Sequence, residues 1–191
     1  MSAERVLEWL DTHQLHYELF NHIPLDNCSV ADKQSIERSG QRLKNLFLRD
    51  NYGRRHFLLV VAVDKQIDLK RLSNQLEVSR IGFASTQRLE KYLNVRPGHV
   101  SLLALLNDPG QQVELLIDID VWQKAEASLA IDYGYQCHPL DNTQTVVLAQ
   151  AELIKFLELQ NRDVDVITVP VMDGAESSKQ VNHVRAEHTD V

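Results

Sequence analysis

The 191-residue sequence lacks the motifs typical of the common nucleotide-dependent and hydrolytic enzymes. It contains no GxxxxGK[ST], GxGxxG, GxSxG or HExxH pattern. These absences exclude the structural devices of P-loop hydrolysis, dinucleotide redox chemistry, serine-hydrolase chemistry and zinc proteolysis. Any catalysis must therefore work without a phosphate-binding loop or a conspicuous activated nucleophile.

Cysteine is also scarce. The two cysteines, Cys28 and Cys137, are far apart and form no CxxC pair, so we expect reduced thiols rather than a disulfide framework or a zinc site. The eight histidines do not change this expectation, because the close histidine pairs have no carboxylate or cysteine partner at ligand spacing. We expect neither a metal nor a cofactor.

Long hydrophobic runs are missing as well. No apolar stretch approaches the roughly 20 residues that span a bilayer, and the N-terminus carries acidic residues where a signal peptide would be apolar. We therefore expect a cytoplasmic protein that does not bind membranes. The content of 43% hydrophobic and 25% charged residues fits one soluble globular domain.

Basic residues are few overall but concentrated in one segment. The formal net charge is −7, which argues against a general nucleic-acid binder. Residues 33–96, however, hold 14 of the 20 Lys and Arg but only 6 of the 27 Asp and Glu. An acidic protein can still present one basic surface to phosphates, because the local field at the docking face decides such contacts. A scatter of these charges over a solvated surface is the alternative.

Apolar spacing and capping residues predict the helices. Ser2, Asp68 and Ser85 are N-cap candidates ahead of amphipathic segments, and Gly40 is a candidate for a helix end. The expected helices cover residues 3–15, 27–40, 68–78, 85–95 and 150–160.

Runs rich in β-forming residues predict two hairpins. Residues 44–50 and 54–64 flank an Asn-Tyr-Gly turn, and residues 99–107 and 111–121 flank Asp-Pro-Gly. Further strand segments are expected at residues 16–22 and 133–149, the latter with an internal turn, and residues 80–85 form either a strand or a connector.

These elements indicate an α+β fold, a single domain with a mixed, largely antiparallel β-sheet wrapped by helices. We expect this domain to cover residues 1–170. From Asp173 the composition turns polar without periodicity, so residues 171–191 are expected to form a flexible polar tail.

Polar residues at unusual positions are the candidates for a functional site. Lys44 and Asn45 precede an apolar triplet at the entrance of an expected buried strand, and His138 lies in a His-Pro pair between apolar strands. A lysine at a strand entrance is commonly a solvated charge that protects a sheet edge. A turn histidine is commonly only packed. Both structural interpretations stay open at this point.

Several segments, taken together, resemble a known family. LKNLFLRD, DLKRL, RIGFAS, PGHVSLLALLND and CHPLDNTQT occur in collinear order and are similar to the family of the bacterial YbaK protein and the prolyl-tRNA synthetase editing insertion. The likeness is greatest to freestanding alanyl-tRNA(Pro) deacylases, also described as prolyl-tRNA synthetase associated domain proteins. It covers nearly all of residues 1–160.

The resemblance implies a reaction and a set of site residues. The reaction is hydrolysis of the ester that joins a wrong amino acid to the terminal adenosine of tRNA(Pro), most plausibly alanine, with assistance from the ribose 2′-hydroxyl. Lys44 matches a lysine that would hold the terminal phosphate or the ester carbonyl, and Asn45 matches the adjoining asparagine. Arg80 is expected to approach the tRNA end, Gly98 opens the glycine loop, and His138 matches the histidine of the amino-acid pocket.

The same resemblance implies a pocket formed by Gly98, Ser101, Leu102 and His138. Leu102 is a departure, because the family's glycine loop usually has proline four residues after the glycine. This difference leaves the identity of the accepted amino acid open.

A second departure lies beside the lysine, where close relatives often carry a His-Thr pair and this chain has Arg42 and Leu43. The two departures leave an alternative open, a non-catalytic module that binds tRNA or a synthetase. The expected partners are mischarged tRNA(Pro) and, as a further candidate, prolyl-tRNA synthetase. A general nucleic-acid binder is less favoured, because the basic segment lacks interleaved aromatics and an RRM-type signature.

Overall fold

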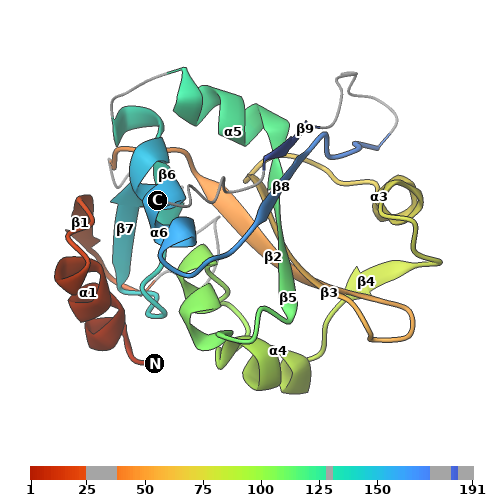
Figure 1. Cartoon of the computed structure of the whole chain (residues 1–191), viewed down its shortest axis with the longest axis horizontal. Coiled ribbons are helices and arrows are strands. Elements are labelled where there is room, and N and C mark those ends of the chain that lie inside the picture. Colours follow the sequence, from red (N-terminus) through yellow and green to blue (C-terminus); the bar gives the residue numbers. More distant parts are fainter. Residues whose placement is uncertain (25–37, 128–130, 173–181, 185–191) are drawn as a thin grey trace, which may run out of the picture.

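Two β-sheets and the helices packed on them make up the described part of the chain (Figure 1). The computed structural model describes residues 1–24, 38–127, 131–172 and 182–184. The larger sheet has the strand order β4-β2-β3-β5-β8-β9, and the smaller sheet has the order β1-β7-β6. The strands are β1 Tyr17–Asn21, β2 Leu43–Asp50, β3 His56–Ala62, β4 Ile81–Phe83, β5 Val113–Asp118, β6 Tyr135–Cys137, β7 Gln144–Leu148, β8 Val164–Ile167 and β9 Asn182–Val184.

The helices begin where the capping residues predict. Ser2 Oγ accepts from the N–H of Arg5, Asp68 caps the next helix through two backbone N–H groups, and Ser85 Oγ accepts from the N–H of Arg88. The α-helices are α1 Ala3–Thr12, α3 Leu69–Gln75, α4 Thr86–Leu93, α5 Ile119–Glu126 and α6 Gln150–Glu158, and the 3₁₀ helices are η1 Leu102–Asn107 and η2 Ile131–Tyr133. The α+β prediction is confirmed, with two sheets in place of one.

The hairpin predicted over residues 44–64 is confirmed. β2 and β3 pair antiparallel from Leu43 opposite Ala62 to Arg49 opposite His56. The turn is stabilised by the Asp50 carboxylate, which accepts from two backbone N–H groups of the turn, and by Gly53, whose φ of +66° suits glycine. The local turn chemistry therefore determines this register.

The second predicted hairpin is wrong. Residues 102–107 form the 3₁₀ helix η1, and β5 pairs in parallel with β3 and with β8. The run Leu102–Leu105 is fully buried at every position, so its apolar pattern has no period that would separate a strand from a helix. The predicted strand over residues 111–121 also ends early, because α5 begins at Ile119.

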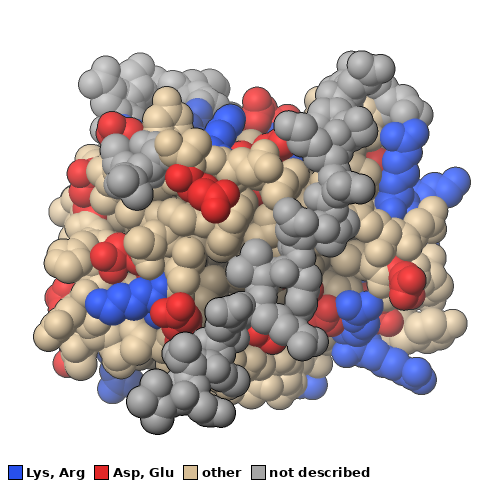
Figure 2. All heavy atoms as spheres, turned by 45° about the horizontal axis from the view of Figure 1, so that its top comes forward, with Lys and Arg blue, Asp and Glu red and all other residues tan. Residues whose placement is uncertain are grey.

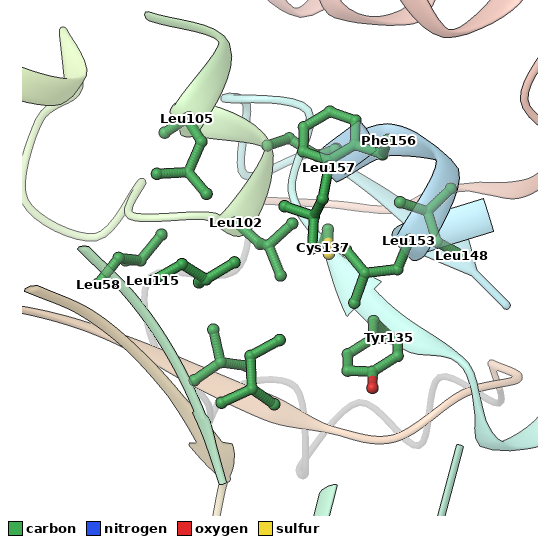
Figure 3. Packing of buried hydrophobic residues seen from close by; sticks show 14 of the residues in the cluster. Leu58, Leu102, Leu105, Leu115, Tyr135, Cys137, Leu148, Leu153, Phe156 and Leu157 are labelled. Atoms are coloured by element: carbon green, nitrogen blue, oxygen red, sulfur yellow. The ribbon is translucent and has the colours of Figure 1, made fainter. Parts of the chain in front are cut away.

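The hydrophobic core lies on both faces of the larger sheet. The larger cluster fills the space between this sheet and β6, β7, η1 and α6; Figure 3 shows Leu58, Leu102, Leu115, Tyr135 and Phe156 among its members. The smaller cluster packs Leu72 of α3 against the opposite face of β2 and β3. The side chains of these two strands are therefore divided between two buried environments.

The segment predicted as a tail includes one short strand. Asn182–Val184 forms β9, which pairs antiparallel with β8. Val171 forms a bridge with Ile67. Residues 173–181 and 185–191 lie outside the described residues, and so does most of the helix predicted over residues 27–40.

Two glycines provide a matched test of the packing around β6. A Cβ atom at Gly134 would lie 2.5 Å from the carbonyl oxygen of Leu148, whereas a Cβ atom at Gly82 meets nothing within 4 Å. We expect Gly134→Ala to lower the free energy of unfolding by about 1–3 kcal/mol, because the backbone of β7 cannot withdraw freely. Gly82→Ala is the control and should change it by less than about 0.5 kcal/mol. Urea unfolding of both variants measures the difference, and equal effects would contradict this account.

Candidate functional site

Lys44 and Asn45 point to opposite faces of the larger sheet. Side chains alternate along a strand, and directly opposite residues of an antiparallel pair share a face. Lys44 lies opposite Val61, which belongs to the cluster under α3, and Lys44 Nζ donates to the carbonyl oxygen of Lys65. Asn45 lies opposite Val60, which belongs to the larger cluster. The side chains of Lys44 and Asn45 therefore lie in two different environments.

The Asn45 amide has an unused acceptor. Its Oδ1 atom is buried and has no hydrogen-bond partner among the described residues. A buried carbonyl without a donor costs about 1–3 kcal/mol, so native proteins rarely leave one unsatisfied away from a functional site. This oxygen can accept a hydrogen bond from a bound molecule.

His138 follows the last residue of β6 and is neutral at pH 7. Burial lowers the pKa of its imidazole, although a contact with the carbonyl of Gln144 works in the opposite direction. Nδ1 lies 3.3 Å from that carbonyl oxygen. Because a carbonyl only accepts, we place the proton on Nδ1, which leaves Nε2 as an acceptor.

A second polar group, not predicted from the sequence, centres on Thr145 of β7. His22 Nε2 lies 2.9 Å from Thr145 Oγ1, and Arg38 Nη1 donates to the same oxygen at 2.9 Å. Arg38 Nε is buried and has no partner among the described residues. β1 and β6 pair with opposite edges of β7, so His22 and His138, each one residue beyond its strand, both lie near the start of β7.

The glycine loop is exposed at its start and buried at its end. Gly98 has a φ of +83°, which suits glycine, and open space surrounds its Cβ position. Ser101 and Leu102 are fully buried; Ser101 caps η1 through the N–H of Leu103.

The predicted site residues lie in different parts of the fold. Asn45 faces the larger cluster, Leu102 belongs to it, and His138 follows its member Cys137, whereas Lys44 faces the other side of the sheet. Arg80 lies elsewhere, because its neighbour Ile81 pairs with Asp50 at the far end of β2. Six residues at about 3.3 Å each separate that end from Lys44 by roughly 20 Å.

Arg80 belongs to a basic and aromatic surface that we call the hairpin end. Tyr52 and Phe83 are 70% and 63% exposed there, and Arg54 lies 5.5 Å from the centre of the Tyr52 ring. Figure 2 shows basic side chains projecting on the right-hand side, which holds α3, β4 and the β2–β3 turn in Figure 1. The hairpin end comprises Arg49, Tyr52, Arg54, Arg80, Phe83 and Arg88.

A groove of about 510 Å³ lies beside the glycine loop, at the C-terminal end of α4. None of the predicted site residues lines it. The groove is lined by Thr86, Glu90, Asn94, Val95, Arg96 and Pro97.

The polar groups near His138 can bind and orient a substrate, but they include no activated nucleophile. Burial raises the pKa of the Cys137 thiol to about 12, so this cysteine is a neutral core residue and not a nucleophile.

Among the described residues, no three His, Cys, Asp or Glu side chains are grouped to hold a metal. No helix in the described ranges is long and apolar enough to cross a membrane.

Comparison with known proteins identifies similar chains. The model of the aminoacyl-tRNA editing domain matches residues 22–156. The prolyl-tRNA editing protein ProX of Acetoanaerobium sticklandii is 36% identical over 157 residues, which cover 82% of this chain and 91% of that protein. Prolyl-tRNA synthetase associated domain-containing protein 1 of Danio rerio is 34% identical over 120 residues, or 63% of this chain and 61% of that protein.

Solved structures agree in fold. A crystal structure described provisionally as a trans-editing enzyme for prolyl-tRNA synthetase superposes with a TM-score of 0.60 and covers 88% of this chain and 97% of its own. At 16% identity this likeness establishes the fold alone.

Proposed function

The chain belongs to the family of aminoacyl-tRNA editing domains, and on that premise we propose that it is a trans-editing aminoacyl-tRNA deacylase acting on mischarged tRNA(Pro). The similarity to ProX, which extends over most of both chains, supports prolyl-tRNA editing. The residues matched to the family model include all the predicted site residues, from Lys44 to His138.

The observation that carries the proposal is the unused acceptor on Asn45. An aminoacyl ester offers a free α-ammonium group, which is a strong donor for such an oxygen. The neutral His138 and the cation of Arg38 both lie near the start of β7. They can bind the polar groups of an aminoacyl ester. We therefore assign Asn45 to the α-ammonium group and His138 to the amino-acid pocket.

The reaction is the addition of water to the ester carbonyl, followed by cleavage of the bond between the carbonyl carbon and the ribose oxygen. The ribose oxygen leaves with a proton, and the products are a free amino acid and uncharged tRNA. An activated ester needs little nucleophilic power from the protein, so positioning and charge stabilisation suffice. We assign Lys44, which faces the other side of β2 from Asn45, to the developing oxyanion or the terminal phosphate, which its long side chain would reach at the end of the sheet, and the substrate's 2′-hydroxyl assists.

We propose alanine as the preferred amino acid. Added bulk in a tight site costs energy, whereas a small side chain only leaves space, so a small pocket rejects prolyl-tRNA by size. Leu102 replaces the proline usual in the family and is fully buried. It therefore affects the pocket through its packing under the glycine loop and not through an exposed surface.

The hairpin end favours a second candidate, a non-catalytic module that holds tRNA or prolyl-tRNA synthetase. The structure corrects the expectation that the basic segment lacks interleaved aromatics, because Tyr52 and Phe83 are exposed beside arginines. Such groups stack on bases and contact phosphates. This surface lies roughly 20 Å along β2 from Lys44. It could also serve the deacylase by holding the tRNA body.

Single-turnover hydrolysis of tRNA(Pro), charged separately with alanine, cysteine, serine or proline, distinguishes these candidates. We expect rapid loss of alanine with proline spared by at least about 100-fold. Faster hydrolysis of seryl- or cysteinyl-tRNA(Pro) would change the assigned substrate but leave the assignment as a deacylase in place. Tight tRNA binding with no hydrolysis of any of the four would overturn the deacylase in favour of the binding module.

A further inference from the structure

Lys44 is connected to a set of charged residues that the proposed reaction does not use. The carbonyl oxygen that accepts from Lys44 Nζ belongs to Lys65, which follows β3. The Lys65 side chain is 13% exposed, and its Nζ contacts Asp118 Oδ2 at 2.6 Å and Asp120 Oδ2 at 3.0 Å. The residue that binds Lys44 through its backbone is therefore itself held by an ion pair.

Asp118 is placed where the parallel strands end. It is the last residue of β5 and is fully buried, and its second oxygen accepts from the N–H of Val169, just after β8, at 3.3 Å. Because β3, β5 and β8 run in parallel, their carboxyl ends meet at one edge of the sheet, where many open sheets bind ligands. Lys44, near the start of the antiparallel strand β2, lies at this same edge.

The contact between Lys65 and Asp118 has the geometry of an ion pair. Burial lowers the pKa of the Lys65 ammonium, but the hydrogen bonds to Asp118 and Asp120 outweigh it and raise that pKa above its ordinary value. Burial raises the pKa of the Asp118 carboxyl, while the hydrogen bond from Lys65 opposes this change. The contact of 2.6 Å is that of a charge-assisted hydrogen bond.

The turn that carries the Lys65 carbonyl is held by backbone hydrogen bonds on both sides and by this ion pair. The N–H of Lys65 donates to the carbonyl of Ala62 in a turn, and the N–H of Val63 donates to the carbonyl of Arg42, the residue two before Lys44. Backbone bonds resume at Gln66, whose carbonyl accepts from the N–H of Met172, and at Asp68, whose N–H donates to the carbonyl of Pro170. Between these bonds the Lys65 side chain adds a contact with β5. We expect loss of the ion pair to loosen this turn locally and, with it, the acceptor of the Lys44 ammonium.

We propose that Lys65 and Asp118 are positioning residues that hold the Lys44 ammonium in its working place through the Lys65 carbonyl. The proposal rests on the role assigned to Lys44 in the proposed function. Neither residue touches the reacting atoms. A lysine side chain has many rotamers, so restricting its ammonium before the substrate arrives removes part of the entropic cost of catalysis.

Asp118→Asn tests this role against a matched control, Asp108→Asn. Both aspartates are buried and paired with a cation, but Asp108 contacts Arg162 at the start of β5, at the other end of that strand. We expect Asp118→Asn to lower the single-turnover rate at saturating enzyme by about tenfold, with the half-saturating concentration unchanged. Asp108→Asn should lower the melting temperature but leave the rate of the folded protein unchanged.

A conservative variant separates charge from general disruption. Lys65→Arg retains a cation that can reach Asp118 and should keep most of the rate, whereas Lys65→Met should behave like Asp118→Asn. Equal rate losses in Asp108→Asn and Asp118→Asn, or an unchanged rate in Asp118→Asn, would overturn the positioning role.

Nuclear magnetic resonance of the lysine ammonium groups tests the contact independently of catalysis. The Lys44 ammonium resonance, assigned by its loss in Lys44→Arg, should be protected from exchange in the wild type and in Asp108→Asn, and lose that protection in Asp118→Asn. Retained protection in Asp118→Asn overturns the inference whether or not the protein is active. Absence of hydrolysis by the wild type overturns the proposed function instead, and the resonance still decides the contact.

Discussion

Lys44→Ala is expected to slow the hydrolysis of alanyl-tRNA(Pro) by about 100-fold or more, with a small loss of stability. Removal of one preorganised donor from an oxyanion site typically costs 10²–10³ in rate. Among the described residues, the Lys44 side chain donates one hydrogen bond, to the Lys65 carbonyl, so the folded state loses little by its removal. Single-turnover hydrolysis and thermal unfolding, measured on the same preparation, test both parts.

Lys70→Ala is the matched control for Lys44→Ala. Lys70 is an exposed lysine in α3, the helix that packs on the same face of the sheet as Lys44. Its removal should leave the rate within about twofold, because surface charges distant from a site act weakly. Full activity of Lys44→Ala would exclude the assigned role, and an equal loss in Lys70→Ala would indicate general attraction of tRNA by positive charge.

Arg162→Met is expected to lower the free energy of unfolding by about 3–5 kcal/mol. The Arg162 guanidinium is 4% exposed and donates to the carbonyl oxygens of Val113 and Asp108, at 2.8 and 2.6 Å, and to the Asp108 carboxylate at 3.2 Å. Removing one member of a buried ion pair leaves an uncompensated charge in the interior, which costs this amount in other proteins. Urea unfolding measures the loss.

Arg96→Met is the control for the side-chain volume and charge removed. Arg96 is exposed on the loop before Gly98, and its replacement should change the stability by less than about 0.5 kcal/mol. The Asp108 carboxylate also accepts hydrogen bonds from the backbone N–H groups of Gln112 and Val113. A small effect of Arg162→Met would mean that these two hydrogen bonds are enough to stabilise its buried charge.

Local signals were sufficient for much of the fold. The Asn-Tyr-Gly turn and its flanking apolar runs predict the β2–β3 hairpin, and the caps Ser2 and Asp68 predict two helix starts. Each of these signals is contained within a few residues that are neighbours in the folded state. The prediction failed at η1 and β5, where a run that is apolar at every position has no period and the strand partners are distant in sequence.

The candidate site divides in the same way. Lys44, Asn45 and His138 could be selected from the sequence, because polar residues at the ends of apolar strands are unusual and their motifs resemble a family. The group around Thr145 could not, since His22 and Arg38 are more than 100 residues from it in the chain. Because side chains alternate along a strand, Lys44 and Asn45 are predicted to face opposite sides of the sheet. The sequence does not predict which of the two hydrophobic clusters each residue faces.

The sequence by itself determined the class of fold, the β2–β3 hairpin, most of the helices and the family resemblance, because turns, caps and apolar periods act over short separations. Only the tertiary structure decided that β5 lies parallel to β3 and β8, that Arg80 lies far from Lys44, and that Asp118 contacts Lys65. These contacts join distant segments. They are selected by the burial of the whole core, which no single stretch of sequence specifies.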